Sequence, residues 1–462
     1  MERVLLQEVA VALGLPPGGT EGIMIESVST DTRTIDAGAL FFALRGERFD
    51  GHDHVGEAFS RGAAAAVVSR DVGETVGPVF AVDDTVEALQ DLATWYRGRF
   101  VLDVVAVTGT NGKTTTKEMT ADVLSQARRT LRTEGNLNNH IGVPLTLFGL
   151  STKHEAAVVE MGMSNPGEIA RLAEIARPDI GVITNVGEAH LESMGDVEAV
   201  ARAKGELLEA LPAAGAAVLN RDDDLVMAQA GRTESRVITF GFSEDADVRA
   251  EAVEEREGSV AFDVVGDGRA VLAIAGRHNV SNALAALAAG RALGVPPDVA
   301  IEGLRSFRPG SMRMAVSEID RLTILNDAYN SNPGSLSAAF ATLAAQATGR
   351  RAWAALGDML ELGPRSESAH REAGAEAARL GVERLFLYGR QVAALREGAI
   401  AAGMPSDAAR VFHDKVDLVR AIQAGLDEET VLLVKGSRGM RMEEVVERLV
   451  GEAPASAIGR SS

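Results

Sequence analysis

The residues best suited to chemistry form a glycine-rich turn that ends in lysine and threonine: Gly109, Thr110, Asn111, Gly112, Lys113, Thr114 and Thr115. The turn follows the apolar run at residues 101–107 and precedes a helical pattern at residues 117–126. Such a turn aims backbone N–H groups at an anion, and glycine lets the backbone approach it. We therefore expect this turn to bind ATP, with Lys113 at the β- and γ-phosphates and the Thr114 hydroxyl on Mg²⁺.

The match to the usual phosphate-loop pattern is incomplete, because Val107 stands where the first glycine belongs. An ordinary turn between a strand and a helix, with a surface lysine, would use similar residues. The apolar run before the turn and the helical pattern after it favour phosphate binding.

Other candidate residues lie where apolar runs end. Glu160 closes the run at residues 156–160, and His190 follows the run at residues 180–185. Carboxyl ends of neighbouring parallel strands meet at one edge, so both side chains could bind a metal beside the phosphate loop. A solvated glutamate or a structural histidine is the alternative. Lys204 lies within a helical pattern, and its default interpretation is a solvated lysine on a helix.

Short apolar runs alternate with helical patterns along most of the chain, which predicts an α/β fold with mostly parallel, doubly wound sheets. We expect three domains, at residues 1–99, 100–312 and 313–462, with a small, polar, disordered tail after Gly451. The 462 residues also exceed the ~250–300 at which single cores stop growing.

The net charge of −20 argues against nucleic acid or anionic lipid as a general partner. The chain has no cysteine, which excludes disulfides and thiolate metal sites. Its first residues do not resemble a signal peptide, and the sequence contains no run of about 18 apolar residues that could span a membrane. We expect a cytoplasmic protein and take a monomer as the default.

Taken in order, a series of motifs resembles those of the Mur ligase family. They lie at residues 29–33, 46–52, 108–115, 136–144, 160–162, 184–190, 203–206, 278–282, 326–330, 357–359 and 435–438. The resemblance implies a small α/β N-terminal domain that binds a UDP substrate, a central phosphate-loop ATPase domain and a C-terminal Rossmann-like domain for an incoming amine. The implied reaction joins D-alanyl-D-alanine to UDP-N-acetylmuramoyl-tripeptide through an acyl phosphate, in peptidoglycan precursor synthesis.

The resemblance also implies roles for individual residues. Thr114 and Glu160 would hold one magnesium ion; His190 and a carbamylated Lys204 would hold a second, and these two residues and Lys113 would be catalytic. ATP would be contacted across a domain cleft by Asn279, Asn282, Arg313 and Asp327. From the residues alone, an amide at the start of the helical pattern at 279–293 could equally be an N-cap. The uridine diphosphate would face Ser29, Thr30, Arg33, Arg45, Gly46, Asp50 and His52.

One departure from the family pattern is Met312, which stands where a glycine is common before Arg313 and so removes a possible hinge. The Asp-Asn-Pro-Arg loop of the diaminopimelate-adding relative is absent, which favours the dipeptide-adding activity. Another Mur ligase, a folylpolyglutamate-synthetase-like enzyme and a nucleotide switch are the alternatives. The third residue of the tripeptide stays open, as do Asp358, Lys435 and Arg438 as candidates for the amine pocket.

Overall fold

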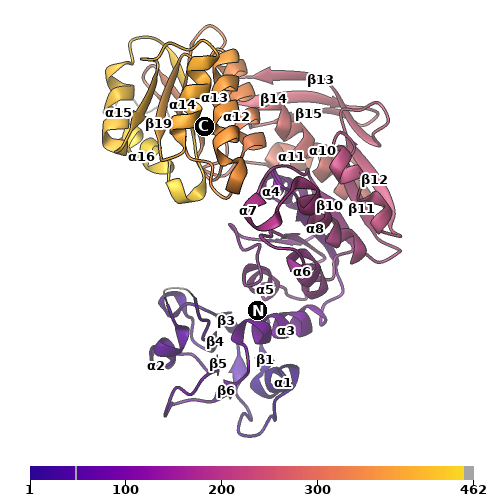
Figure 1. Cartoon of the computed structure of the whole chain (residues 1–462). Coiled ribbons are helices and arrows are strands. Elements are labelled where there is room, and N and C mark those ends of the chain that lie inside the picture. The colour runs from indigo at the N-terminus through magenta and orange to yellow at the C-terminus, as the bar shows by residue number, and fades with distance from the viewer. Residues whose placement is uncertain (47–48, 452–462) are drawn as a thin grey trace.

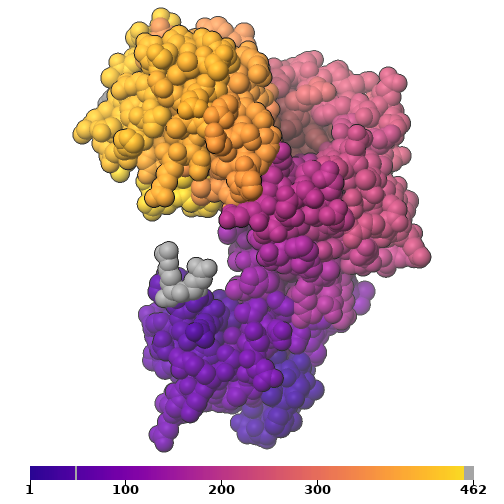
Figure 2. Space-filling view, in the orientation of Figure 1, coloured from indigo at the N-terminus to yellow at the C-terminus, as the bar shows by residue number. Residues whose placement is uncertain are grey.

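The computed structural model describes residues 1–46 and 49–451. Its elements form four sheets arranged along the chain as three domains, with the N-terminal domain at one end and the C-terminal domain at the other (Figure 1). On the face shown in Figure 2, an open gap separates these two outer domains, whereas the central and C-terminal domains touch. Glu47, Arg48 and the predicted tail at residues 452–462 lie outside the described residues.

The N-terminal domain holds two small sheets. A two-stranded antiparallel sheet pairs β1 (Val4–Leu5) with β2 (Met24–Ile25), and a four-stranded parallel sheet has the order β3-β4-β5-β6. The parallel strands are β3 (Ser27–Ser29), β4 (Ala39–Phe42), β5 (Ala65–Val68) and β6 (Val79–Ala81). The helices are α1 (Leu6–Ala12), η1 (Thr32–Thr34), η2 (Gly51–His54), α2 (Val55–Ser60) and α3 (Thr85–Arg97).

The central domain is built on a nine-stranded sheet of order β15-β14-β13-β12-β11-β10-β7-β9-β8. The strands from β7 to β12 run parallel because helices cross between them: β7 (Asp103–Thr108), β8 (Thr130–Arg132), β9 (Ala156–Glu160), β10 (Ile180–Ile183), β11 (Ala216–Asn220) and β12 (Arg236–Gly241). The helices are α4 (Lys113–Ser125), α5 (Gly142–Leu147), α6 (Glu168–Ala176), α7 (Leu191–Met194), α8 (Val197–Glu209), α9 (Asp224–Met227), η3 (Ala230–Arg232), α10 (Arg277–Ala292) and α11 (Pro297–Ser306). The first strand, β7, lies between β10 and β9. The order in which successive strands are added to the sheet therefore reverses beside β7, and ligands bind at the carboxyl edge of such a point.

The sequence did not predict the end of this sheet. β13 (Val248–Arg256) pairs antiparallel with β14 (Ser259–Val264), and β14 with β15 (Gly268–Leu272). Turns of two and three residues connect these strands, which leaves no room for a crossover helix. The outer half of β13 is rich in exposed charged residues, so it lacks the apolar run that marked the buried strands.

The C-terminal domain has a six-stranded sheet of order β16-β17-β21-β18-β19-β20, in which only the edge strand β16 is antiparallel. The strands are β16 (Ala315–Ile319), β17 (Leu322–Asp327), β18 (Arg351–Gly357), β19 (Arg384–Tyr388), β20 (Ala409–Phe412) and β21 (Thr430–Lys435). The helices are α12 (Pro333–Gln346), η4 (Gly363–Arg365), α13 (Ser366–Arg379), α14 (Val392–Ala401), α15 (Lys415–Ala424), η5 (Arg438–Met440) and α16 (Glu443–Gly451).

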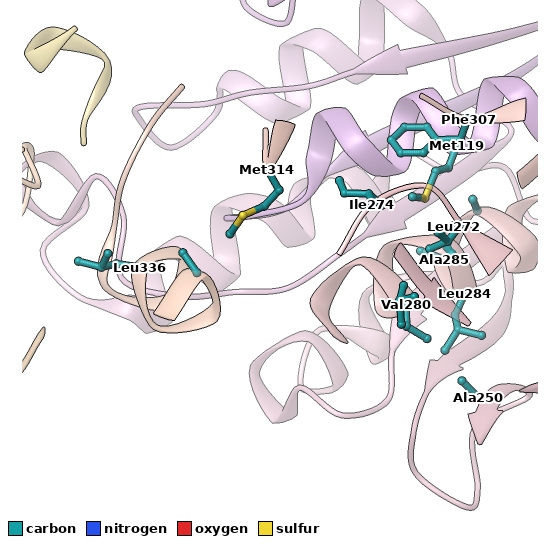
Figure 3. Close-up of a cluster of buried hydrophobic side chains, with 14 of the residues drawn as sticks. Met119, Ala250, Leu272, Ile274, Val280, Leu284, Ala285, Phe307, Met314 and Leu336 are labelled. Atoms are coloured by element: carbon teal, nitrogen blue, oxygen red, sulfur yellow. The ribbon is translucent and has the colours of Figure 1, made fainter. Parts of the chain in front are cut away.

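Buried apolar contacts join the central and C-terminal domains. One continuous cluster contains residues of the central sheet, α10, α12 and the C-terminal sheet. In Figure 3, Met314 at the entry to the C-terminal domain lies between Leu336 of α12 and Ile274 of the central domain. The Gln346 side chain makes two hydrogen bonds at the turn between β13 and β14. It accepts one from the Gly258 N–H at 3.0 Å and donates one to the Arg256 carbonyl at 2.8 Å.

The predicted α/β, three-domain class is confirmed. The predicted boundaries at 99/100 and 312/313 lie in segments that connect sheets, between α3 and β7 and between α11 and β16, and they stay predictions. Within residues 1–46 and 49–451, no helix is both long enough and apolar enough to cross a bilayer.

Candidate functional site

The predicted phosphate loop lies at the carboxyl end of β7, the strand beside which the strand order of the sheet reverses. Gly109 and Gly112 have left-handed φ angles of 148° and 79°. A Cβ on Gly109 would lie 1.9 Å from the Thr184 hydroxyl oxygen, and one on Gly112 would lie 2.2 Å from Asn282 Oδ1. Both positions therefore require glycine. No side chain caps the N-terminus of α4, which leaves its N–H groups available to an anion.

The segment after β10 holds the loop in place. Asn185 Oδ1 accepts a hydrogen bond from the Asn111 N–H at 2.8 Å, and its carbonyl accepts one from the Thr110 N–H at 2.9 Å. The Thr184 hydroxyl donates to the Asn111 carbonyl at 2.6 Å. The loop is thus held by side chains and backbone before any ligand arrives, which lowers the entropy lost on binding.

Two cationic side chains meet at the start of α4. Lys113 Nζ donates to the carbonyls of Gly109 and Thr110, at 2.8 and 3.1 Å. Burial lowers the pKa of Lys113, nearby Glu160 opposes that shift, and Arg313 adds to it. Arg313, from the segment that enters the C-terminal domain, donates to the Thr114 hydroxyl at 2.8 Å and stacks on the Tyr329 ring at 4.0 Å. These groups place positive charge where a polyphosphate would lie.

Glu160 occupies the carboxyl end of β9, beside β7, and is 1% exposed. Its Oε1 accepts a hydrogen bond from Asn138 at 2.7 Å, whereas its Oε2 is buried and has no partner among the described residues. A buried carboxylate oxygen without a partner is costly, and a cation would satisfy it. The described part of the chain holds no group of three or more His, Asp or Glu side chains suited to a metal. Mg²⁺, however, is commonly held by one or two carboxylates together with substrate phosphates and water. Glu160 and Thr114 fit that pattern.

Lys204 lies in α8 and is 3% exposed, so the sequence-based default of a solvated lysine is wrong. Burial lowers the pKa of its ammonium well below the ordinary value of 10.5, and the Lys113 charge lowers it further. The Lys204 side chain makes no hydrogen bond or ion pair with the residues that the structure describes. The helical pattern around Lys204 gave no signal for this burial, because the burial depends on how α8 packs in the folded domain.

His190 follows β10 and has a left-handed φ of 56°. Burial lowers the pKa of its imidazole; Glu361 opposes the shift, and Lys113 and Lys204 reinforce it. The structure thus brings His190, Lys113 and Lys204 within electrostatic reach of one another. Glu361, which the sequence analysis did not single out, lies with Oε2 2.7 Å from His190 Nδ1.

The amides at the start of α10 lie against the phosphate loop. Asn279 Oδ1 accepts from Asn282 Nδ2 at 3.1 Å, and Asn282 Oδ1 accepts from the Thr116 hydroxyl at 3.3 Å. Neither amide caps α10. Thr115, in the first turn of α4, is also buried.

Asp327 closes β17 and lies at the domain boundary. Its carboxylate accepts from the Met314 N–H at 3.3 Å and pairs with the buried Lys435 ammonium. Met312 does not have a positive φ, whereas Met314 has a φ of 53°. The backbone therefore needs no glycine at Met312, and the left-handed turn lies two residues later.

A cavity of about 340 Å³ opens between the phosphate-loop helix and the entry to the C-terminal domain. Its lining residues include Thr114, Thr115, Ile274, Phe307, Arg313 and Tyr329. A second contact crosses the boundary nearby, where the Asn111 and Asn332 amides donate to each other at 3.3 and 2.7 Å. No pattern in the sequence signalled this pairing, because it depends on the docking of the two domains.

The residues predicted to face a uridine diphosphate lie in the N-terminal domain, away from the phosphate loop. Arg33 and Arg45 are exposed, Gly46 follows at the surface, and Ser29 and Thr30 are half-buried at the end of β3. The predicted loop at residues 45–52 includes 47–48, which lie outside the described residues.

Asp50 and His52 are bonded within the domain. His52 is 4% exposed, its Nδ1 lies 2.5 Å from Asp50 Oδ1, and its Nε2 accepts from the Ser69 N–H at 2.8 Å. Asp50 accepts a further bond from the His52 N–H, which holds its pKa at about 2. Both ring nitrogens of His52 are therefore used in shaping the loop.

The central sheet with its phosphate loop, and the second α/β domain docked across that loop, define a three-domain protein of the phosphate-loop class. Three family models match the chain: "Mur ligase family, catalytic domain" at residues 24–97, "Mur ligase middle domain" at 107–290 and "Mur ligase, glutamate ligase domain" at 312–438. This chain belongs to the Mur ligase family.

Similar proteins cover nearly the whole chain. UDP-N-acetylmuramoyl-tripeptide–D-alanyl-D-alanine ligase of Bacillus subtilis (strain 168) is 39% identical over 94% of this chain and 95% of its own. The protein of that name from Escherichia coli (strain K12) is 38% identical over 92% and 94%. Among solved structures, MurF from Acinetobacter baumannii has a TM-score of 0.89 at 31% identity, covering 98% of this chain and 100% of its own. MurF ligase from Thermotoga maritima, solved in complex with ADP, has a TM-score of 0.82 at 29% identity, covering 92% and 97%.

We predict that Gly112→Ala weakens ATP binding at least ~10-fold, measured by calorimetry. The substitution places a Cβ in a left-handed residue, at a cost of roughly 1–2 kcal/mol, and against Asn282, which its own hydrogen bonds hold in place. Gly167→Ala is the matched control: Gly167 precedes α6 with a φ of 86°, but its Cβ would meet nothing within 4 Å. Equal loss of ATP affinity in both variants would contradict the prediction.

Proposed function

We propose that this protein is an ATP-dependent ligase that joins D-alanyl-D-alanine to UDP-N-acetylmuramoyl-tripeptide in the cytoplasm, as a monomer, during peptidoglycan precursor synthesis. The names of the relatives from Bacillus subtilis and Escherichia coli support this substrate pair. The observation that carries the proposal is the Arg313–Thr114 contact, which joins the C-terminal domain to the first turn after the phosphate loop. A ligase of this kind needs ATP and two substrates from different domains to meet at one point.

The residues around the phosphate loop bind and orient ATP. The ADP in the Thermotoga maritima neighbour supports a nucleotide here. Lys113 and the N-terminus of α4 would hold the phosphates, and Arg313 would move from the Thr114 hydroxyl to the phosphates when ATP binds. Asn279, Asn282 and Asp327 would contact the nucleotide from either side of the domain boundary.

In the proposed reaction, an oxygen of the tripeptide's terminal carboxylate attacks the γ-phosphorus, the bond to ADP breaks, and an acyl phosphate forms. The amine of D-alanyl-D-alanine then attacks the acyl carbon, loses a proton, and expels phosphate. The protein contributes mainly positioning and charge neutralisation, which suits phosphoryl transfer. Docking of the C-terminal domain would keep water from the acyl phosphate.

Two magnesium ions would supply charge neutralisation on the phosphate oxygens. Thr114 and Glu160 fit the first, because Glu160 Oε2 is buried without a partner. His190 and Lys204 fit the second only if Lys204 gains a negative charge. The lowered pKa of Lys204 makes this possible, because a neutral amine attacks CO₂, forms an N–C bond and releases a proton to give a carbamate.

The outer domains would hold the two substrates. Arg33 and Arg45 are exposed cations suited to the diphosphate of the UDP substrate, with Ser29, Thr30 and Gly46 beside them. Asp50 and His52 would act by holding the shape of the loop. Of the three candidates for the amine pocket, Asp358 accepts three backbone N–H groups before α14 and Lys435 pairs with Asp327, which leaves Arg438 as the more exposed cation.

The test is phosphate release from ATP with each substrate alone and with both. We expect release to require UDP-N-acetylmuramoyl-tripeptide and D-alanyl-D-alanine together, because the amine must consume the acyl phosphate for turnover. Release with a single amino acid in place of the dipeptide would assign the chain to a sister ligase. Release that needs no acceptor would contradict ligase function.

Carbamylation of Lys204 predicts a carbamate carbon signal in ¹³C NMR of protein equilibrated with ¹³C-bicarbonate. Because the pKa of Lys204 is lowered, its neutral fraction should fall less between pH 9 and 7.5 than that of an ordinary lysine. For an ordinary lysine of pKa 10.5, that fraction falls about tenfold per pH unit in this range. The signal should vanish in Lys204→Arg and persist in Lys113→Ala. A signal that survives Lys204→Arg, or its absence from the unchanged protein, would contradict the assignment.

A further inference from the structure

The segment at residues 358–361, here called the Glu361 loop, is fixed to the C-terminal domain by its own hydrogen bonds. The Asp358 carboxylate accepts from three consecutive N–H groups at residues 390–392, at 2.7, 2.9 and 3.1 Å. The Met359 N–H donates to His370 Nε2 at 3.0 Å, and the Leu360 N–H donates to the Ser437 hydroxyl at 2.9 Å. The position of Glu361 is therefore set by the C-terminal domain as a rigid unit.

This loop reaches the central domain at the segment that carries His190. Glu361 Oε2 lies 2.7 Å from His190 Nδ1, and the Glu361 carbonyl accepts from the Glu192 N–H at 3.4 Å. Nearby, Arg365 Nε donates to Glu188 Oε1 at 3.1 Å. The contact thus consists of several polar interactions between residues 361–365 of the C-terminal domain and residues 188–192 of the central domain. It depends on the docked arrangement of these two domains.

Both residues of the central pair have unusual backbones. His190 has a φ of 56° and Glu361 a φ of 64°, in a region that residues with a Cβ enter at an energetic cost. Left-handed residues other than glycine are few in the described chain, and here two of them face each other across a domain boundary. Such strain tends to persist where it serves a function.

The contact determines which imidazole nitrogen is free. With Glu361 Oε2 2.7 Å from Nδ1, the carboxylate favours a proton on that nitrogen, which leaves the lone pair of Nε2 available to a metal. A carboxylate in this position orients a metal-binding histidine and increases its basicity as a ligand.

We propose that Glu361 is a positioning residue for His190, so that the His190 metal site is complete only when the C-terminal domain is docked. The inference rests on the proposed function, in which His190 is a ligand of the second ion. Binding of that ion and docking of the domain then favour each other, because a coupling between two equilibria is reciprocal.

The test is Mn²⁺ binding, followed by electron paramagnetic resonance of free Mn²⁺, with full-length protein saturated with a non-hydrolysable ATP analogue. The His190-dependent site is the one lost in His190→Ala. We expect Glu361→Ala to weaken this site about tenfold or more, the range seen when such partners of metal ligands are removed. Glu361→Gln should weaken it less, because its amide oxygen still accepts from Nδ1–H.

Glu367→Gln is the matched control, since Glu367 lies six residues away in the same domain and pairs at the surface with Arg371 of α13. It removes the same charge and should leave Mn²⁺ affinity unchanged. In the His190→Ala background, Glu361→Ala should have no further effect.

The outcomes separate the two hypotheses. Loss of a Mn²⁺ site in His190→Ala but full affinity in Glu361→Ala would overturn the positioning role and leave the proposed function intact. Equal binding in His190→Ala and the unchanged protein would refute His190 as a ligand. An equal loss in Glu367→Gln and Glu361→Ala would show a general charge effect and would also overturn the inference.

Discussion

The close approach of the phosphate loop to Thr184 and Asn282 is the constraint on which the rest of the site depends. Gly109 and Gly112 allow that approach, because any Cβ there would overlap those side chains. Once the loop lies against them, its backbone is held by Thr184 and Asn185, and α4 starts with uncapped N–H groups. The loop also fixes the positions of Lys113 and Thr114, which meet the C-terminal domain through Arg313.

Charge is distributed unevenly around this loop. The chain as a whole carries a net charge of −20, yet the Lys113 charge lies close enough to lower the pKa of the Lys204 ammonium. The carboxylate near Lys113, that of Glu160, has one buried oxygen without a partner among the described residues. An ATP polyphosphate with magnesium would satisfy both kinds of group, and a carbamate on Lys204 would remove one of the two like charges. The site thus gains stability from the ligands that the proposed reaction requires.

The sequence predicted the parts of the fold that depend on local pattern. The apolar runs at residues 101–107, 156–160 and 180–185 correspond to the buried strands β7, β9 and β10, and Glu160 ends one of them as expected. The antiparallel strands β13–β15 were not predicted, and in the outer half of β13 exposed charged residues interrupt the apolar pattern. Burial of Lys204 and the contact of Glu361 with His190 could not be predicted, because each depends on packing between segments far apart in the chain. The proposed role of Lys204 came from the resemblance to the Mur ligase motifs and not from the residue pattern of its helix.

The central claim is that the tripeptide carboxylate is activated by direct transfer of the γ-phosphate. The most direct measurement uses UDP-N-acetylmuramoyl-tripeptide labelled with ¹⁸O in its terminal carboxylate, followed by mass analysis of the phosphate released with D-alanyl-D-alanine. An acyl phosphate predicts that one ¹⁸O atom passes to phosphate in each turnover. Phosphate that carries no label from the carboxylate would contradict the account.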